Sequence, residues 1–331
     1  MSAANLPALL QRFFTERLQG QLGASPHTVA SYRDTFRLLL LFGSARLARE
    51  PSQLRVEDLD EALINAFLEH LERERSSSPK TRNIRLAAVR AFFRFVAYTE
   101  PACSLQCQQV LAIPNKRHER STVEFLSEEE TAALLAAPDT TTWIGRRDRT
   151  LLEVAVQTGL RNSEIRSLRR RDVQLGAGAY VRCLGKGRKA RCTPLRRDVA
   201  AALMSWLREH SGEPEDPVFP GSRGGPLSAD ALQALVHRHI ATASVNCPAL
   251  VGRSISPHTL RHAAAMNLLQ HGVDLTVIAL WLGHESTETT QIYLHADMRL
   301  KERALGHAVP SGTRPRRFRP SDSLLAFLKS L

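Results

Sequence analysis

The chain has 331 residues and carries 45 lysines and arginines against 33 aspartates and glutamates, so its formal net charge is +12 and its isoelectric point is about 10.1. This charge favours a polyanionic partner, and the length is sufficient for two domains. No apolar run is long enough for a membrane helix and residues 1–10 lack the pattern of a signal peptide, so we expect a soluble protein that is neither embedded in a membrane nor secreted. Five cysteines without the spacing of a disulfide framework fit a reducing compartment, so we expect a cytoplasmic protein with free thiols.

The first part of the chain has the pattern of a helical domain and contains no convincing strand. Helices are predicted over residues 6–18, 27–42, 61–74 and 78–98. The last helix carries basic residues among its apolar positions, and its candidates for contact with DNA are Lys80, Arg82, Arg85 and Arg90. A core helix with a solvated basic face fits this pattern as well as a helix that lies on DNA.

A break in the helical pattern follows over residues 101–120 and ends in the basic stretch 114–120. We expect an exposed linker that runs along a phosphate backbone, with Lys116 and Arg117 as its candidate contacts. A second domain then opens with a helix whose capping box pairs Ser127 with Glu130.

Two short predicted strands, residues 179–184 and 190–195, flank Gly185-Lys186-Gly187, which is the pattern of a β-hairpin. The turn would hold the ammonium of Lys186 at its tip. Cys183 and Cys192 are predicted to lie opposite each other across this hairpin, where a disulfide would be strained. The remainder of the domain is predicted to be helical, so the fold class is mainly α with a small antiparallel β-sheet in the C-terminal domain (α+β).

Two arginines lie in motifs that suit a phosphodiester ligand. Arg161 lies within residues 158–164 and Arg261 within residues 257–262. A guanidinium is always charged, and its planar fork fits two phosphate oxygens at once. Ser256-Pro257 predicts a helix start that runs on to Gly272, and it places His258 and Arg261 on one face at an end that attracts anions.

Tyr293 is the candidate nucleophile, because a phenol can attack phosphorus once a base accepts its proton. His258 is the candidate base, and His284 adds a donor for the phosphate. The departing 5′ oxygen needs a proton, which Lys186 can supply as general acid. Glu164 follows Arg161 by three residues and is predicted to orient it or another basic group.

A metal site is the competing chemistry, since His258 and His262 are four residues apart and His284 and His295 follow. A zinc-protease motif requires Glu directly after the first His, and Thr259 occupies that position. Two-metal nucleases gather several carboxylates, whereas these motifs contain mainly Glu164. We therefore predict no metal and no cofactor.

The order and spacing of these motifs closely resemble the tyrosine recombinase family, also called the phage integrase family, including its Xer-like and mobile-element members. The resemblance covers nearly the whole chain. It implies that a phosphate is surrounded by five side chains and attacked by a sixth: Arg161, Lys186, His258, Arg261 and His284, with Tyr293 as nucleophile.

The resemblance also implies a domain organisation. Residues 1–110 would form a helical, SAM-like core-binding domain, residues 111–125 a basic linker and residues 126–309 the catalytic domain, and together they would make a C-shaped clamp around DNA. The sequence of residues 310–331 predicts a tether and a short C-terminal helix with an apolar face, which could fold back on its own domain. The resemblance favours docking in trans on a neighbouring protomer.

The expected function is site-specific recombination of double-stranded DNA with an inverted-repeat core site, through a 3′-phosphotyrosyl intermediate and a Holliday junction. The expected assembly is a homo-tetramer on two DNA sites, with related recombinases as possible partners. Integration, excision or transposition of a mobile element is the favoured role. The alternatives are chromosome or plasmid dimer resolution, relaxation like that of a type IB topoisomerase, and a non-catalytic DNA-binding factor. The complete set of six residues argues against the last alternative.

Overall fold

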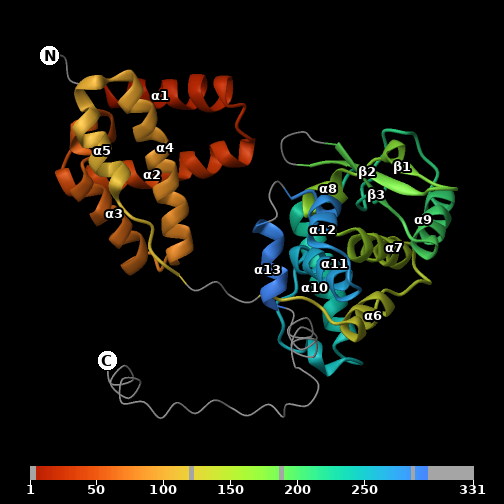
Figure 1. Cartoon of the computed structure of the whole chain (residues 1–331). Coiled ribbons are helices and arrows are strands. Elements are labelled where there is room, and N and C mark those ends of the chain that lie inside the picture. Colours follow the sequence, from red (N-terminus) through yellow and green to blue (C-terminus); the bar gives the residue numbers. More distant parts are fainter. Residues whose placement is uncertain (1–4, 119–122, 186–189, 285–287, 297–331) are drawn as a thin grey trace, which may run out of the picture. The chain divides into compact units, whose positions relative to one another are not determined.

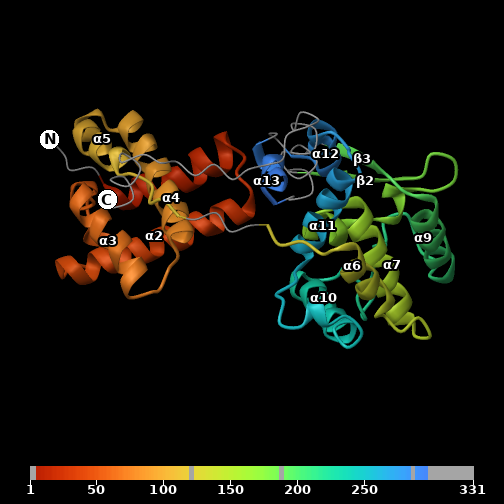
Figure 2. The same ribbon diagram turned by 60° about the horizontal axis from the view of Figure 1, so that its bottom comes forward.

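The computed structural model describes residues 5–118, 123–185, 190–284 and 288–296 (Figures 1 and 2). The chain divides into an N-terminal unit, Met1–Arg120, and a C-terminal unit, Ser121–Leu331. Two predicted features, Lys186 and the tether and helix of residues 310–331, lie outside the described residues. None of the helices within the described ranges combines the length and the apolar character that a membrane span requires.

The N-terminal unit is built from helices alone in its described part, residues 5–118. Ser25 and Ser78 each cap a helix whose first residue is proline, which explains where the two longest helices begin. The predicted first helix is α-helical only at its start and continues as a π-helix. The break predicted over residues 101–120 is wrong in its first half, which forms a helix over Ser104–Ala112 that buries Cys107 and Val110 in the core. The helices are α1 (Leu6–Arg12), the π-helix η1 (Phe13–Gln21), α2 (Pro26–Leu47), α3 (Glu61–Arg73), α4 (Pro79–Thr99) and α5 (Ser104–Ala112), with short 3-10 turns at Pro51–Gln53, Val56–Asp58 and Pro101–Cys103.

Phenylalanine rings form the centre of the N-terminal core. Phe13, Phe36 and Phe92 are buried, and the ring of Phe92 lies 5.4 Å from that of Phe13 and 5.2 Å from that of Phe36, in edge-to-face geometry. These contacts join η1, α2 and α4. The apolar face of α4 is therefore part of the core.

In its described part, the C-terminal unit is α+β, as predicted, with a small sheet at one edge of the helices (Figure 1). Ser127 and Glu130 form the predicted capping box. The helices are α6 (Glu128–Ala136), α7 (Trp143–Thr158), α8 (Asn162–Ser167), α9 (Arg197–Glu209), α10 (Ala229–Ala243), α11 (Pro257–Gln270), α12 (Leu275–Leu282) and α13 (Glu288–Ala296), with 3-10 turns at Arg170–Asp172 and Pro248–Leu250. The strands are β1 (Val173–Gln174), β2 (Tyr180–Leu184) and β3 (Ala190–Pro194), in the antiparallel order β1-β2-β3.

The register of the hairpin corrects one prediction. Cys183 pairs with Arg191 and Cys192 pairs with Arg182, so the two cysteines are offset by one residue. Successive residues of a strand point to opposite faces, and accordingly Cys183 is buried whereas Cys192 is exposed. The two thiols do not face each other, and all five cysteines are free.

Helix α7 packs against α9 and α11 and leads directly into the residues of the predicted site. A buried carboxylate fixes its N-terminal half: Asp148 accepts hydrogen bonds from Arg147 and, across to α10, from Arg238 and His239, at 2.7 to 2.8 Å. Because Asp148 has no exposed surface, the loss of these partners would leave a buried charge uncompensated. The helix is thus a rigid support for its other end.

Candidate active site

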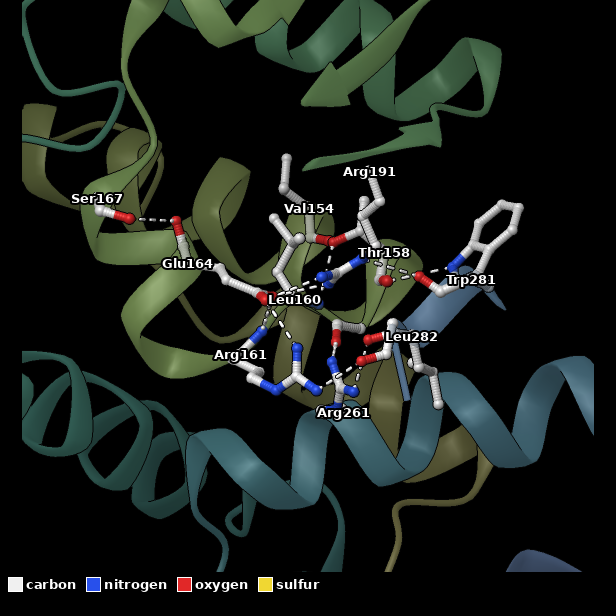
Figure 3. Close-up of polar contacts among 12 residues, drawn as sticks. Val154, Thr158, Leu160, Arg161, Glu164, Ser167, Arg191, Arg261, Trp281 and Leu282 are labelled. Atoms are coloured by element: carbon white, nitrogen blue, oxygen red, sulfur yellow. Dashed lines mark hydrogen bonds and ion pairs between the residues drawn. The ribbon is translucent and has the colours of Figure 1, made fainter. Parts of the chain in front are cut away.

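Residues of β3, α11 and α12, which are far apart in the sequence, converge at the C-terminal end of α7 (Figure 3). Gly159 ends α7 in the left-handed conformation, with φ of 62°. A Cβ atom at this position would lie 2.6 Å from the side chain of Leu282, at the end of α12. Glycine therefore permits both the turn and the close approach of α12.

Arg261 is the deepest charged group of the site, with 2% of its surface exposed. Its Nη1 donates to the carbonyl of Gly159 and its Nη2 to the carbonyl of Leu282, each at 2.7 Å. Burial, and next the charge of Arg161, lower the pKa of Arg261 to about 10. The helix start predicted at Ser256 and Pro257 is confirmed, and it sets this side chain in the second turn of α11.

Arg161 lies at the N-cap of α8 and is more accessible, with 30% of its side chain exposed. Its Nη1 donates to Glu164 at 2.9 Å and its Nη2 to the carbonyl of Gly283 at 2.8 Å. The two predicted arginines therefore donate to neighbouring carbonyls, those of Leu282 and Gly283. Helix α12 ends there, and carbonyls at a helix C-terminus attract cations.

Glu164 is buried and accepts four hydrogen bonds from two arginines. The backbone N–H and Nη1 of Arg161 donate to it, and so do Nη1 and Nη2 of Arg191, at 2.7 to 2.9 Å. Burial alone would raise the pKa of this carboxyl, but the bonds from Arg191 and Arg161 outweigh it and hold the pKa at about 2. Glu164 is thus ionised and contacts Arg161, as an orienting residue would.

Arg191 is a residue of the site that the sequence did not reveal. It lies on β3, and its Nε donates to the carbonyl of Trp281 at 3.2 Å (Figure 3). The alternating pattern of β3 is the sequence signal that could have identified Arg191, because residues two apart share a face of a strand and Thr193 on that face is buried. An inward-facing arginine needs a buried carboxylate, and Glu164 is the acid in the neighbouring motifs.

Tyr293 lies on α13 and is 1% exposed. Its hydroxyl is 2.9 Å from Nδ1 of His262, not of His258. Burial raises the pKa of Tyr293 to about 12, although the charge of Arg261 acts in the opposite direction. Burial, then the charges of His258 and Arg261, lower the pKa of His262 to about 4. The phenol is therefore protonated and faces a neutral imidazole.

The two predicted histidines flank this pair. The exposed His258 packs edge to face on His262, with ring centroids 4.4 Å apart. The ring of His284 lies parallel to that of Tyr293 at 6.5 Å, and its Nδ1 is 2.8 Å from the hydroxyl of Thr290. Burial, then the charges of Arg261 and Arg161, lower the pKa of His284 to about 4. From the sequence, His262 is proposed only as a candidate metal ligand, and its contact with Tyr293 is not predicted.

The candidates for DNA contact in the N-terminal unit fall into two groups. Arg82, Arg85 and Arg90 are half-buried and bind groups of their own unit, namely Glu72, the hydroxyl of Thr35 and the carbonyl of Ile113. The exposed candidates are Lys80, Lys116 and Arg117, of which Lys116 also pairs with Glu72 at 3.0 Å.

Across the described ranges, no three side chains of His, Cys, Asp or Glu come close enough together to hold a metal ion. His258 and His262 instead pack on each other, and His262 bonds to Tyr293.

Comparison with known proteins matches the phage integrase family over residues 124–299 and the phage integrase N-terminal SAM-like domain over residues 11–99. "Putative integrase/recombinase y4rC" of Sinorhizobium fredii is 52% identical over 328 residues, which are 99% of either chain. Tyrosine recombinase XerC of Xylella fastidiosa is 32% identical over 93% of this chain and 99% of that protein. Among solved structures, the XerH site-specific recombinase bound to palindromic difH substrate, a post-cleavage complex, has a TM-score of 0.67 and 25% identity over 82% of this chain and 78% of that one.

The carboxylate of Glu164 makes a stability prediction possible. Its folded-state pKa of about 2 is below the ordinary value of 4.5, so its contribution, about 3 kcal/mol, is present above pH 4.5 and disappears as the pH falls toward 2. The unfolding free energy of Glu164→Gln is therefore expected to be lower than that of the unchanged protein at pH 7, with a difference that narrows below pH 4.5. Urea unfolding at several pH values measures this, and a constant difference would contradict it.

Proposed function

The chain belongs to the phage integrase family of tyrosine recombinases, enzymes that break and rejoin DNA at specific sites, and we propose that Tyr293 attacks the scissile phosphate to form a 3′-phosphotyrosyl intermediate. One observation carries this proposal: a tyrosine and two guanidiniums share one site. The positive charge of Arg261 lowers the pKa of the Tyr293 phenol, and the positive charge of Arg161 lowers the pKa of Arg261. A covalent phosphotyrosine conserves the energy of the phosphodiester, so a 5′ hydroxyl of another strand can rejoin the DNA.

Arg161 and Arg261 bind the non-bridging oxygens in this proposal. A guanidinium has five N–H donors, and the two bonds that Arg261 makes to carbonyls leave three for a ligand. Two fixed cations stabilise the charge that grows on these oxygens in the transition state. His284 adds a donor, and Glu164 orients Arg161.

The proton of Tyr293 leaves through the histidine pair. The hydroxyl is bonded to His262, and His258 lies directly behind it and is exposed, so His258 can pass the proton to solvent. A phenol that is 1% exposed cannot reach DNA, so the described arrangement is a resting state. Tyr293 becomes accessible when the protein engages its substrate. Lys186 protonates the departing 5′ oxygen.

The proposed substrate is double-stranded DNA with an inverted-repeat core site. Recombination needs two such sites and several nucleophiles, so the proposed assembly is a tetramer that passes through a Holliday junction. The exposed Lys80, Lys116 and Arg117 bind phosphates from the N-terminal domain and the linker, residues 1–110 and 111–125. Integration, excision or transposition of a mobile element is the proposed role, and the relative at 52% identity, named an integrase/recombinase, supports it. This role can be tested by searching the DNA that flanks the gene for an inverted repeat and measuring whether the purified protein binds it.

Removal of one oxygen atom tests the nucleophile. Tyr293→Phe is expected to bind a half-site with nearly unchanged affinity and to form no covalent complex on a nicked suicide substrate, because the attacking oxygen is gone. Gel shift and denaturing electrophoresis measure the two properties. A covalent adduct in this variant would refute the assignment of Tyr293.

A change of leaving group tests Lys186. Lys186→Ala is expected to cleave an ordinary substrate slowly and a substrate with a bridging 5′ sulfur nearly as fast as the unchanged protein does, since sulfur leaves without a proton. Arg161→Ala and Arg261→Ala serve as controls that sulfur does not rescue, because they lose stabilisation of the non-bridging oxygens. Equal rescue of all three variants would exclude the acid role of Lys186.

The C-terminal segment, residues 310–331, is proposed to act between protomers as a tether and a helix that docks in trans. Deletion of residues 321–331 is expected to preserve binding to one half-site and to weaken cooperative assembly on full sites, with less strand exchange. Half-site and full-site gel shifts, together with a recombination assay, measure this. A truncated protein that assembles and recombines like the intact one would contradict trans docking.

A further inference from the structure

Arg191 is a half-buried arginine for which the proposed chemistry has no role. Its side chain is 12% exposed, and each of its three nitrogens donates a hydrogen bond. Nη1 and Nη2 bind the two oxygens of Glu164 at 2.9 and 2.7 Å, and Nε binds the carbonyl of Trp281 at 3.2 Å. The fork of Arg191 is thus turned toward a carboxylate, whereas Arg161 is 30% exposed. Arg191 is not arranged as a phosphate ligand.

Arg191 contacts both groups that hold Arg161 in place. The first group is Glu164, which accepts from the backbone and the guanidinium of Arg161. The second is Gly283, whose carbonyl accepts from Nη2 of Arg161. A Cβ atom on Gly283 would lie 2.8 Å from Nη1 and 3.1 Å from Cδ of Arg191, so the arginine lies directly on this backbone.

We propose that Arg191 is a positioning residue for strand cleavage, which fixes Glu164 and the backbone at Gly283 and thereby holds Arg161 in the orientation that binds the scissile phosphate. This inference rests on the proposed function of the site. Glu164 without Arg191 would keep one cationic partner and could rotate about its side-chain bonds. A small misplacement of a phosphate-binding group is costly, since about 1 Å can slow a reaction about 100-fold.

The geometry also predicts that lysine cannot replace Arg191. An ammonium is a compact charge and lacks the planar fork that binds both oxygens of Glu164 while Nε binds Trp281. Arg191→Lys is therefore expected to retain the charge and the fold but to cleave slowly.

The test compares two substrates in single-turnover cleavage by the full chain. One carries an ordinary scissile phosphate, and the other carries a methylphosphonate, in which a methyl group replaces a charged non-bridging oxygen. Cleavage of the uncharged group depends less on a guanidinium. Arg191→Met is expected to bind a half-site within about 2-fold of the unchanged protein and to cleave the phosphate roughly 10- to 100-fold more slowly. The deficit is expected to shrink on the methylphosphonate, as for Arg161→Ala.

Arg253→Met is the matched control. Arg253 also binds a buried glutamate, Glu130, and a backbone carbonyl, that of Phe125, but neither partner touches Arg161. Its variant is expected to cleave both substrates at the unchanged rates. An equal deficit of Arg191→Met on the two substrates would show that Arg191 only supports the fold, and a parallel loss of half-site binding would show that it contacts DNA. Either result, or cleavage at the unchanged rate, overturns the proposal.

A double variant covers the case in which Arg191→Met does not fold. Glu164→Gln with Arg191→Met removes both members of the buried pair, so no charge of that pair remains uncompensated. If Arg191 acts by positioning Arg161, the deficit of the double variant shrinks on the methylphosphonate substrate, as that of Glu164→Gln alone does. A deficit of the double variant that is equal on the two substrates would overturn the proposal. Covalent adduct formation by the unchanged protein distinguishes failure of this proposal from failure of the proposed function. If the unchanged protein forms no covalent adduct with DNA, the proposed recombinase chemistry itself is wrong.

Discussion

The structure of the site depends on three consecutive backbone carbonyls at the end of α12. Those of Trp281, Leu282 and Gly283 accept hydrogen bonds from Arg191, Arg261 and Arg161, respectively. Carbonyls at a helix C-terminus have no partner within the helix and carry partial negative charge, so they are suited to bind guanidiniums. One helix end thereby brings together arginines from α8, β3 and α11. Any change that moves the end of α12 therefore alters the positions of all three arginine side chains.

Among the described residues, the charges around this helix end do not balance. Arg161, Arg191 and Arg261 face one buried carboxylate of the described part of the chain, that of Glu164, which the arginines keep ionised. Burial, and next the charge of Arg161, lower the pKa of Arg261 to about 10, so its charged form is destabilised at this position. An anion beside Arg161 and Arg261 would stabilise that charge. In the proposed chemistry, a bound phosphate would offset part of the cost of burying positive charge in the free protein.

The proposed nucleophile, Tyr293, differs from the arginines because its proton is held in place. Tyr293 is buried, protonated and bonded to His262, with pKa values of about 12 and about 4 that oppose transfer of its proton. Cleavage by a free protomer would leave broken DNA without a partner strand, so a nucleophile that is inaccessible before assembly is consistent with recombination. Arg161, with 30% of its side chain exposed, is accessible in the free protein, whereas Tyr293 and Arg261 still have to become accessible.

The sequence by itself determined the motifs and several helix starts, because these depend on neighbours within a few residues. It did not reveal α5, which lies within the predicted break over residues 101–120. Ser25, Ser78 and Ser256 with their following prolines set helix starts, and the capping box at Ser127 set another. Only the tertiary structure decided which side chains meet. Glu164 and Arg191 are 27 residues apart, His262 and Tyr293 are 31 apart, and Arg161 reaches Gly283 across 122 residues. The hairpin shows the same limit, since its pattern was predicted but its pairing of Cys183 with Arg191 was not. A one-residue offset reverses the faces of a strand, and only the packing of that strand against the core selects the register.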